Sequence, residues 1–270
     1  MKKFLSALET QIRLGADEYA ALFNNRNDMY NPHAFSQPYL SCFCRSCIER
    51  GIDIREGGTV YKSVHGVGIT GMATAADSLA AIEEVVFNKK YLTLAELRDV
   101  LKNDFEERRD VKARLISAPK YGNNSDFADK YAEYLLNLTA DFFKNKHTRD
   151  GGRFYIAMAS NVQNISAGYE VGASPDGRKS KKALSDAASP MRGRDERGLT
   201  ALIHSVTKLD YTKCACGTVI NLKFSENFFK DKNKQNKLRS ALRVYFERGG
   251  QEIQINCVSR QKLKDAMEHP

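Results

Sequence analysis

The 270 residues carry 42 Lys and Arg against 33 Asp and Glu, and 42% of them are apolar, with 14 Phe, 12 Tyr and no Trp. This apolar content excludes a disordered chain, and no run of about 18 apolar residues exists that would predict a membrane-spanning helix. The first residues lack the apolar core of a secretory signal, and the six Cys show no compact disulfide spacing. We therefore expect a cytoplasmic protein with reduced thiols and no membrane partner.

The positive charge is concentrated in one segment. Residues 178–248 hold 17 Lys and Arg and 7 Asp and Glu, a net charge of +10, whereas the remaining 199 residues have a net charge of −1. A basic segment can bind nucleic acid or phosphate. Its Lys-rich stretches lack interleaved aromatic residues and a nucleic-acid motif, so we prefer a solvated basic surface and do not expect a nucleic-acid partner.

Helices dominate the predicted elements of the first half. Phe4, Leu8 and Ile12 recur at helical spacing and predict an amphipathic helix over residues 4–24. Thr93 and Glu96 form a capping box that opens a helix reaching about residue 105. The other segments of this half are predicted as a loop at 25–40, a helix at 41–51, a glycine-rich stretch at 57–71, a helix at 72–88, a turn at 119–124 and a helix at about 126–147.

Strands appear in the second half. Short apolar runs predict strands at residues 154–158, 200–206 and 219–224, and residues 251–258 alternate as a strand does. Helices are predicted at 234–248 and 260–268, and the segment 164–198, rich in Gly, Pro, Ser and Arg, is predicted as a long loop. Helices that alternate with short apolar strands indicate an α/β architecture.

The polar side chains of the last predicted strand leave two interpretations open. Gln254 and Asn256 lie on one face of the strand, and Ile253, Ile255 and Cys257 lie on the other. The amides would line the polar lumen of a barrel, or they would face solvent on an edge strand. Alternation alone does not distinguish these arrangements.

Several longer strings are more specific than the turn and helix signals common to α/β proteins. They are, in order, Cys47 to Gly51, Gly57-Gly58-x-x-Tyr61, Ala76 to Ile82, Lys120 to Asn124, Gly172 to Arg178, Ser189 to Asp195, Ser205 to Leu209, Gly249 to Asn256 and Leu263 to Pro270. Together these strings resemble the glycyl radical enzymes, which comprise pyruvate formate-lyase (formate C-acetyltransferase) and the glycerol, diol and choline-cleaving members. The resemblance covers nearly the whole chain.

The resemblance implies a ten-stranded α/β barrel that encloses two loops. One loop carries a catalytic Cys, and the other carries a Gly that an S-adenosylmethionine-dependent iron–sulfur activase converts to a backbone radical. The radical forms a thiyl radical on the Cys, which attacks the substrate under anaerobic conditions. Members of the family are usually homodimers, and they need the activating enzyme as a partner.

The sequence departs from the family at both ends. In the family the catalytic Cys loop precedes the first of these strings, and the radical Gly loop follows the last, whereas this chain runs from Met1 to Pro270. We expect residues 1–270 to be a single partial domain, the second half-barrel with its outer helices, inactive alone and binding no cofactor. The alternatives are a subunit completed in trans by the missing loops, or a basic interaction or nucleic-acid-binding module. The string from Ser189 to Asp195 looks closer to the formate-lyase branch than to the dehydratases.

The cysteines offer two further candidate sites. Cys47 and Glu49 match the Cys-x-Glu of the dehydratase thiyl site, where the Glu is a general base, but their context matches a second string outside that loop, so a structural thiol is the preferred interpretation. A metal or cluster site is the second candidate. Buried reduced thiols are the preferred interpretation, because C-x-C links strain the tetrahedral geometry of a metal site. The candidate metal ligands are Cys42, Cys44, Cys47, Cys214 and Cys216.

The remaining motif residues are interpreted as structural. Asp77 and Ser78 are predicted to lie at the start of a helix or in its packing. Residues 121–124 and 176–178 are predicted as turns. The resemblance implies that Arg178, Arg192 and Arg194 could order the radical Gly segment or an anionic ligand, with surface exposure as the alternative. The motif positions of barrel and loops are Gly57, Gly58, Tyr61, Asp77, Ser78, Tyr121, Gly122, Asn123, Pro175, Asp176, Gly177, Arg178, Arg194, Gln254 and Asn256.

Overall fold

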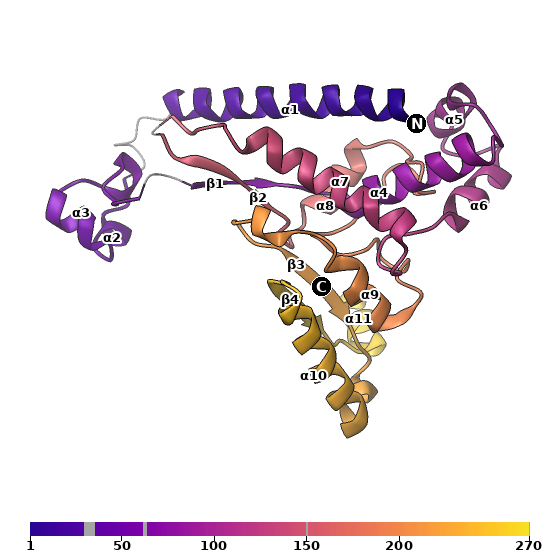
Figure 1. Ribbon diagram of the computed structural model, residues 1–270. Coiled ribbons are helices and arrows are strands. Elements are labelled where there is room, and N and C mark those ends of the chain that lie inside the picture. The colour runs from indigo at the N-terminus through magenta and orange to yellow at the C-terminus, as the bar shows by residue number, and fades with distance from the viewer. Residues whose placement is uncertain (30–35, 62–63, 150, 270) are drawn as a thin grey trace. The chain divides into compact units, whose positions relative to one another are not determined.

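A computed structural model describes residues 1–29, 36–61, 64–149 and 151–269 (Figure 1). The chain divides into two compact units, one formed by Met1–Val67 with Asn137–Ile156 and the other by Gly68–Leu136 with Ala157–Pro270. Within the described ranges, every helix is too short or too polar to cross a lipid bilayer. Helices and short strands alternate, so the predicted α/β class is confirmed.

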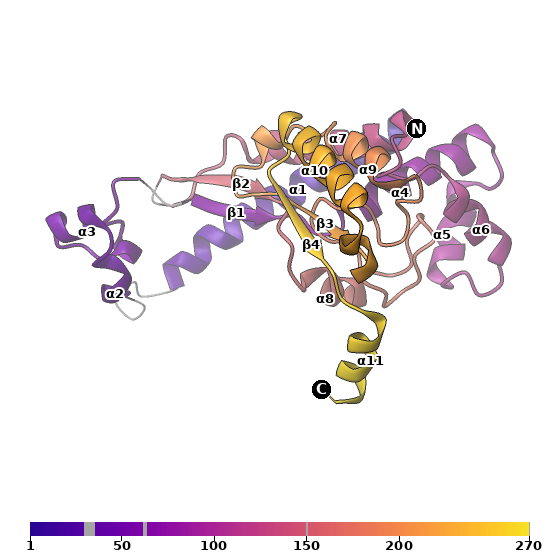
Figure 2. The ribbon, with the colours of Figure 1, turned by 90° about the horizontal axis from the view of Figure 1, so that it is seen from below.

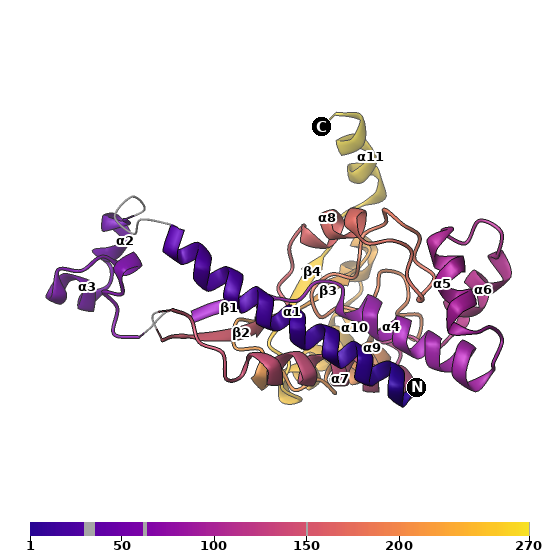
Figure 3. The same ribbon diagram turned by 90° about the horizontal axis from the view of Figure 1, so that it is seen from above.

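The first unit is built on a long helix and a strand pair. Helix α1 (Lys2–Met29) lies over β1 (Val64–Gly68) and β2 (Arg153–Ala157), which form a two-stranded sheet (Figure 3). Tyr19 stacks on His65 at 5.9 Å between ring centroids, and Phe23 meets Phe154 edge-on at 5.4 Å. The predicted helix at 4–24 is therefore confirmed and extended, because α1 continues into the segment predicted as a loop.

A group of short helices follows in the same unit. It contains α2 (Pro38–Ser41), α3 (Arg45–Arg50) and the 3₁₀ turn η2 (Ile54–Glu56). The Asp53 carboxylate accepts hydrogen bonds from Gln37 N at 2.9 Å and Ser41 Oγ at 2.8 Å, which ties α2 to η2. The predicted loop at 25–40 is thus wrong at both ends, where α1 and α2 are helical, and its residues 30–35 lie outside the described chain.

Helices pack in succession at the start of the second unit. They are α4 (Met72–Ala81), which continues as the π-helix η3 (Ile82–Asn88), α5 (Leu94–Lys102), α6 (Arg109–Ser117) and the beginning of α7 (Asp126–Phe143). The predicted capping box of α5 is confirmed, since Glu96 N donates to Thr93 Oγ1 at 3.2 Å and Thr93 N donates to Glu96 Oε2 at 2.6 Å. Helix α6 was not predicted, although Val111 and Leu115 are buried at the i, i+4 spacing.

A parallel strand pair forms the other part of this unit. Strands β3 (Val219–Lys223) and β4 (Glu252–Asn256) pair in parallel, with Asn221 opposite Gln254 (Figure 2). The crossover between them consists of the 3₁₀ turn η5 (Glu226–Lys230) and helix α10 (Lys232–Glu247), as parallel pairing requires. The predicted strands at 219–224 and 251–258 and the predicted helix at 234–248 are confirmed. Helix α11 (Arg260–Glu268) follows β4 and is exposed along its length.

Two predictions for this unit are wrong. Residues 200–206, predicted as a strand, form helix α9 (Gly198–Val206), because a short apolar run fits a buried helix as well as a strand. The segment 164–198, predicted as a loop, begins with helix α8 (Gln163–Glu170). Its remainder has no helix or strand before α9, but many of its polar and small side chains are buried. A 3₁₀ turn, η4 (Tyr211–Lys213), separates α9 from β3.

Candidate functional site

Family motif residues meet in the second unit at what we call the buried polar junction, defined as Asp77, Lys120, Tyr121 and Asp176. Asp77, on α4, has no exposed surface, and its Oδ1 accepts a hydrogen bond from Tyr121 N at 2.7 Å. Its Oδ2 is buried without a hydrogen-bond partner among the described residues. Asp77 therefore joins α4 to the 119–124 turn, and one of its oxygens is unsatisfied.

Burial perturbs the charges of the junction. It raises the pKa of Asp77 to about 7, and the neighbouring Asp176 acts in the same direction, whereas the Tyr121 hydrogen bond and the Lys120 charge oppose it. Burial also lowers the pKa of Lys120 to about 8. Lys120 Nζ donates to the carbonyls of Leu115 and Ala118, each at 2.8 Å, and so caps the C-terminal end of α6.

A second motif, the turn around Asp176, is buried and fully hydrogen-bonded. Asp176 Oδ1 accepts from Ser174 Oγ at 2.6 Å and from Arg178 N at 3.2 Å. Arg178 is only 4% exposed. Its Nε donates to Ser174 Oγ at 3.0 Å, and its two terminal nitrogens donate to the backbone carbonyls of Val171, Gly172, Lys179 and Lys182.

All five N–H groups of Arg178 are thus used inside its own loop. The surface position considered for this residue is wrong, and no donor remains for an anionic ligand. Arg192 is exposed and Arg194 is half-buried, so of the three arginines considered these two remain accessible.

Gly177 is held by both its backbone conformation and its neighbour. Its φ is +92°, and a Cβ at this position would lie 2.5 Å from Ile116 Cγ1. Gly193 also has a positive φ, +76°, but nothing lies within 4 Å of a Cβ there. We expect Gly177→Ala to lower the free energy of unfolding by about 3 kcal/mol, because left-handed strain and overpacking add.

Gly193→Ala is the matched control for this prediction. It carries the conformational strain alone, so we expect a loss of about 1 kcal/mol. Urea unfolding of both variants and the parent chain measures the difference. Equal midpoints for the two variants would show that contact with Ile116 has no effect.

The predicted turn at 119–124 is confirmed, with φ of +94° at Gly122 and +50° at Asn124. A Cβ on Gly122 would lie 2.3 Å from Pro190 Cγ, so only glycine fits against the 189–195 string. Asn123 extends this link, since its Nδ2 donates to Arg194 O at 2.6 Å and its Oδ1 accepts from Arg197 N at 3.0 Å.

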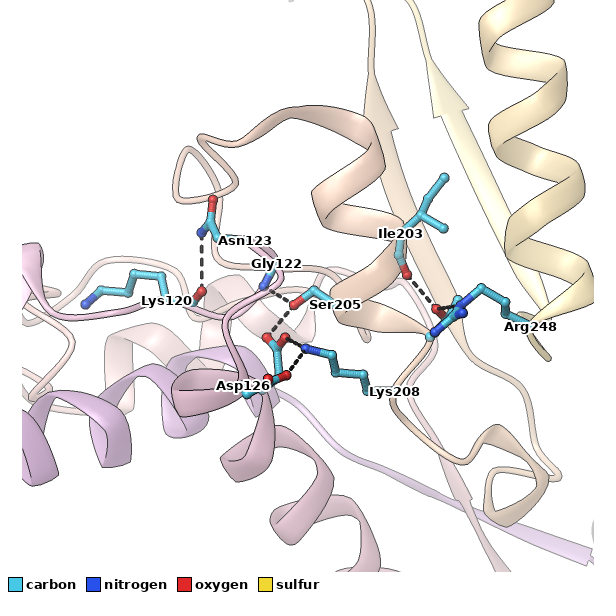
Figure 4. A network of polar contacts seen from close by, with 10 residues as sticks. Lys120, Gly122, Asn123, Asp126, Ile203, Ser205, Lys208 and Arg248 are labelled. Atoms are coloured by element: carbon cyan, nitrogen blue, oxygen red, sulfur yellow. Dashed lines mark hydrogen bonds and ion pairs between the residues drawn. The ribbon is translucent and has the colours of Figure 1, made fainter.

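A chain of polar contacts below this turn was missed from the sequence (Figure 4). Gly122 N donates to Ser205 Oγ at 2.8 Å, and Ser205 Oγ donates to Asp129 Oδ1. Lys208 Nζ then bridges Asp129 Oδ2 at 2.7 Å and Asp126 Oδ1 at 2.6 Å. Asp129 could have indicated this contact, because it lies on the same face of α7 as the buried Ala132 and Leu136. An acidic side chain on the apolar face of a helix predicts a buried polar partner.

The Cys47–Glu49 string does not form an acid–base pair. Cys47 is 3% exposed, and burial raises the pKa of its thiol. A Cβ on Gly58 would come within 2.8 Å of Cys47 Sγ, so this thiol packs directly on the glycine. Glu49 is exposed and pairs with Arg45 at 2.9 Å. Tyr61, the last residue of the adjoining string, is 85% exposed.

The cysteines proposed as metal ligands separate into two groups. Cys42, Cys44 and Cys47 belong to the first unit, and Cys214 and Cys216 belong to the second. Among the residues that the structure describes, no three His, Cys, Asp or Glu side chains are placed to hold a metal ion. Burial raises the pKa of Cys214 to about 12, as expected for an inert packed thiol.

The amides at the strand pair form a smaller polar row. Asn221 Nδ2 donates to Asp186 Oδ2 at 2.7 Å and to Ser160 Oγ at 3.0 Å, and Asn256 Nδ2 donates to Asn221 Oδ1 at 3.4 Å. Gln254 is exposed. Within the described ranges β4 pairs with β3 alone, so the lumen and edge interpretations of this row both stay open.

Two family models match the chain. Residues 1–168 match the model described as pyruvate formate lyase-like, and residues 184–270 match the model described as glycine radical. The two matches together contain every residue of the buried polar junction except Asp176.

The most similar proteins include dehydratases. The probable dehydratase YbiW of Escherichia coli is 35% identical over 240 residues, which cover 85% of this chain and 30% of that protein. Trans-4-hydroxy-L-proline dehydratase of Clostridioides difficile is 33% identical over 237 residues, 86% of this chain and 29% of that protein. The glycerol-bound structure of the B12-independent glycerol dehydratase from Clostridium butyricum superposes with a TM-score of 0.93 at 32% identity, over 100% of this chain and 34% of that one. The chain therefore spans about a third of the length of these relatives.

Proposed function

Because this chain belongs to the pyruvate formate lyase-like family of glycyl radical enzymes, we propose that it forms one wall of a radical lyase of the dehydratase type. Both compact units would be parts of one partial domain in the ten-stranded barrel of that family. The reaction would be elimination of a hydroxyl group from a small hydroxylated substrate. The names of the relatives favour this branch over the formate-lyase branch that the Ser189 to Asp195 string indicated.

The observation that carries the proposal is the buried polar junction. Through Tyr121 it joins separate parts of the chain, since Tyr121 N donates to Asp77 Oδ1 and Tyr121 Oη donates to Ala188 O. Beside the junction, Arg178 directs all its donors to its own loop, and Asn123 binds the backbone at Arg194 and Arg197. Such an arrangement fixes loops in place, as a barrel wall around a radical reaction requires, and it does not itself bind substrate.

We place the two radical residues of the reaction outside residues 1–270. A glycyl radical supplies hydrogen-atom abstraction when it is present. The last glycines of this chain have other roles, since Gly249 ends α10 with a φ of +89° and a Cβ on Gly250 would lie 2.3 Å from the Tyr245 ring. Cys47 is packed on Gly58, and Glu49 of the same string pairs with Arg45. These four positions support a chain that is inactive alone.

The partners follow from the same proposal. An S-adenosylmethionine-dependent activase would act on the polypeptide that carries the radical glycine, and the complete enzyme would be a homodimer in the cytoplasm. A subunit completed in trans by the missing loops is the alternative arrangement. It places the same wall in the same barrel, so the same experiment tests both.

The experiment reconstitutes the barrel without oxygen. The 270-residue chain is treated with an activase and S-adenosylmethionine, first alone and then with polypeptides that carry the Cys and Gly loops of a dehydratase relative. We expect a glycyl radical in the electron spin resonance spectrum and dehydration of a 1,2-diol only in the second mixture. Turnover by the chain alone would overturn the placement of the radical residues, and a stable complex without any radical would overturn the completion in trans.

A further inference from the structure

Two cysteines lie within the first turn of one helix in the first unit. Cys44 precedes α3 as its N-cap residue, and Cys47 is the third residue of this helix. Cys47 N donates to Cys44 O at 2.9 Å, which fixes the backbone between the two residues. The spacing is C-x-x-C, the shortest spacing at which redox-active protein dithiols commonly occur.

The two thiols differ in accessibility. Cys44 is half-buried, so a small reagent can reach it, whereas Cys47 is only 3% exposed. Gly58 holds Cys47 in place, because its missing side chain leaves the space that Cys47 Sγ occupies. Arg50 holds this glycine segment in turn, donating to the carbonyls of Gly57 at 3.2 Å and Gly58 at 3.3 Å. The inner thiol is therefore packed against the glycine segment and shielded from solvent.

From this placement at the start of α3 and the difference in exposure we infer that Cys44 and Cys47 are a redox-active dithiol that closes to an intrachain disulfide by exchange with a small-molecule disulfide. The Cys44 thiolate attacks one sulfur of the reagent and expels its first half as a thiolate, leaving a mixed disulfide. Cys47 loses its proton to water and attacks the Cys44 sulfur, expelling the second half. The two protein thiols are oxidised by two electrons, and the reagent is reduced to two thiols.

The same chain contains an internal comparison. Cys42 is exposed and lies two residues before Cys44, outside the first turn of α3. Cys214 and Cys216 are separated by one residue only, and Cys214 is buried. If accessibility alone governed oxidation, Cys42 would react first and would end as a mixed disulfide.

The test is oxidation of the folded chain with oxidised glutathione, followed by alkylation and peptide mapping. Trypsin cleaves after Arg45, between the two cysteines, so a Cys44–Cys47 disulfide links the peptide that ends at Arg45 to Ser46–Arg50. We expect this linked pair, loss of two of the six thiols, and full recovery of both with dithiothreitol. Cys42→Ser should preserve the link, and Cys44→Ser should abolish it.

Several results would overturn the inference. These are glutathione retained on Cys44 without a link, a link that persists in Cys44→Ser, or a link lost in Cys42→Ser. Circular dichroism establishes that each variant is folded. Cys47→Ala removes the resolving thiol and should leave glutathione on Cys44 as a mixed disulfide. No radical chemistry is needed, so the outcome is independent of the proposed function.

Discussion

Replacing Arg178 with lysine is expected to lower the free energy of unfolding of the chain by about 3 kcal/mol, at the lower end of the cost of disrupting a buried charged group. The guanidinium reaches Ser174 Oγ and four backbone carbonyls at once, including Lys182 O at 2.7 Å. A lysine ammonium has three donors on one nitrogen and cannot occupy positions spread over both sides of a planar fork. Several buried carbonyls would lose their partners, each at a cost of about 1–3 kcal/mol before the loop relaxes.

Urea unfolding followed by circular dichroism measures this loss. Arg192→Lys is the matched control, because Arg192 lies in the same irregular segment and is exposed. A surface change of this kind shifts stability by about 0.5 kcal/mol or less. Coincident unfolding curves for Arg178→Lys and the parent chain would show that these hydrogen bonds do not hold the loop.

Four of the nine strings that carry the family resemblance meet at or against the buried polar junction. Asp77 belongs to one, Tyr121 to a second and Asp176 to a third, and the Pro190 ring against Gly122 brings in a fourth. Their residue types follow from local requirements. A glycine is needed where a Cβ would clash, and an Asp is needed where a backbone N–H must be satisfied inside the core.

Local signals allowed much of the fold to be predicted. The Thr93 capping box, the alternation at 251–258 and the helix stop at Gly249 all depend on neighbours within a few residues. Helix α9 was mispredicted because the seven residues 200–206, four of them apolar, are too few to show a periodicity that excludes a strand. Tertiary burial decided its state, with Leu202, Ile203 and Val206 in the core at helical spacing.

The contacts of the candidate site could not be predicted in the same way. Arg178 resembles a surface residue in sequence, because Gly, Pro and Lys surround it. Its burial depends on carbonyls that point inward only after the loop has closed. The link from Gly122 through Ser205 to Asp129 joins residues up to 83 positions apart, and no local pattern encodes such a distance. The one local indication of this link was Asp129, an acidic residue on the buried face of α7.

The stability of the chain is expected to fall as the pH rises from about 4 to about 7, and Asp77→Asn should remove most of this fall. Burial also raises the pKa of Asp176, which therefore contributes in the same direction. An unfolded aspartate titrates near 3.9, whereas burial raises the pKa of Asp77 to about 7 in the folded chain. Between these values the folded state binds more protons than the unfolded state, so the free energy of unfolding decreases with pH. Full titration across about three pKa units corresponds to about 4 kcal/mol.

Thermal or urea unfolding at a series of pH values tests this behaviour. In Asp77→Asn the side-chain amide would keep an oxygen that accepts from Tyr121 N and would carry no charge, so the variant should be most stabilised relative to the parent above pH 7 and least below pH 4. Asp195→Asn is the control, because Asp195 is exposed in a neighbouring motif string.

Lys120 has the opposite effect on stability, since its pKa is lowered in the folded chain and stability therefore rises between about pH 8 and pH 10.5. The parent chain should therefore show a minimum of stability between these two limbs, and a fall from pH 4 to 7 that persists unchanged in Asp77→Asn would assign it to other groups.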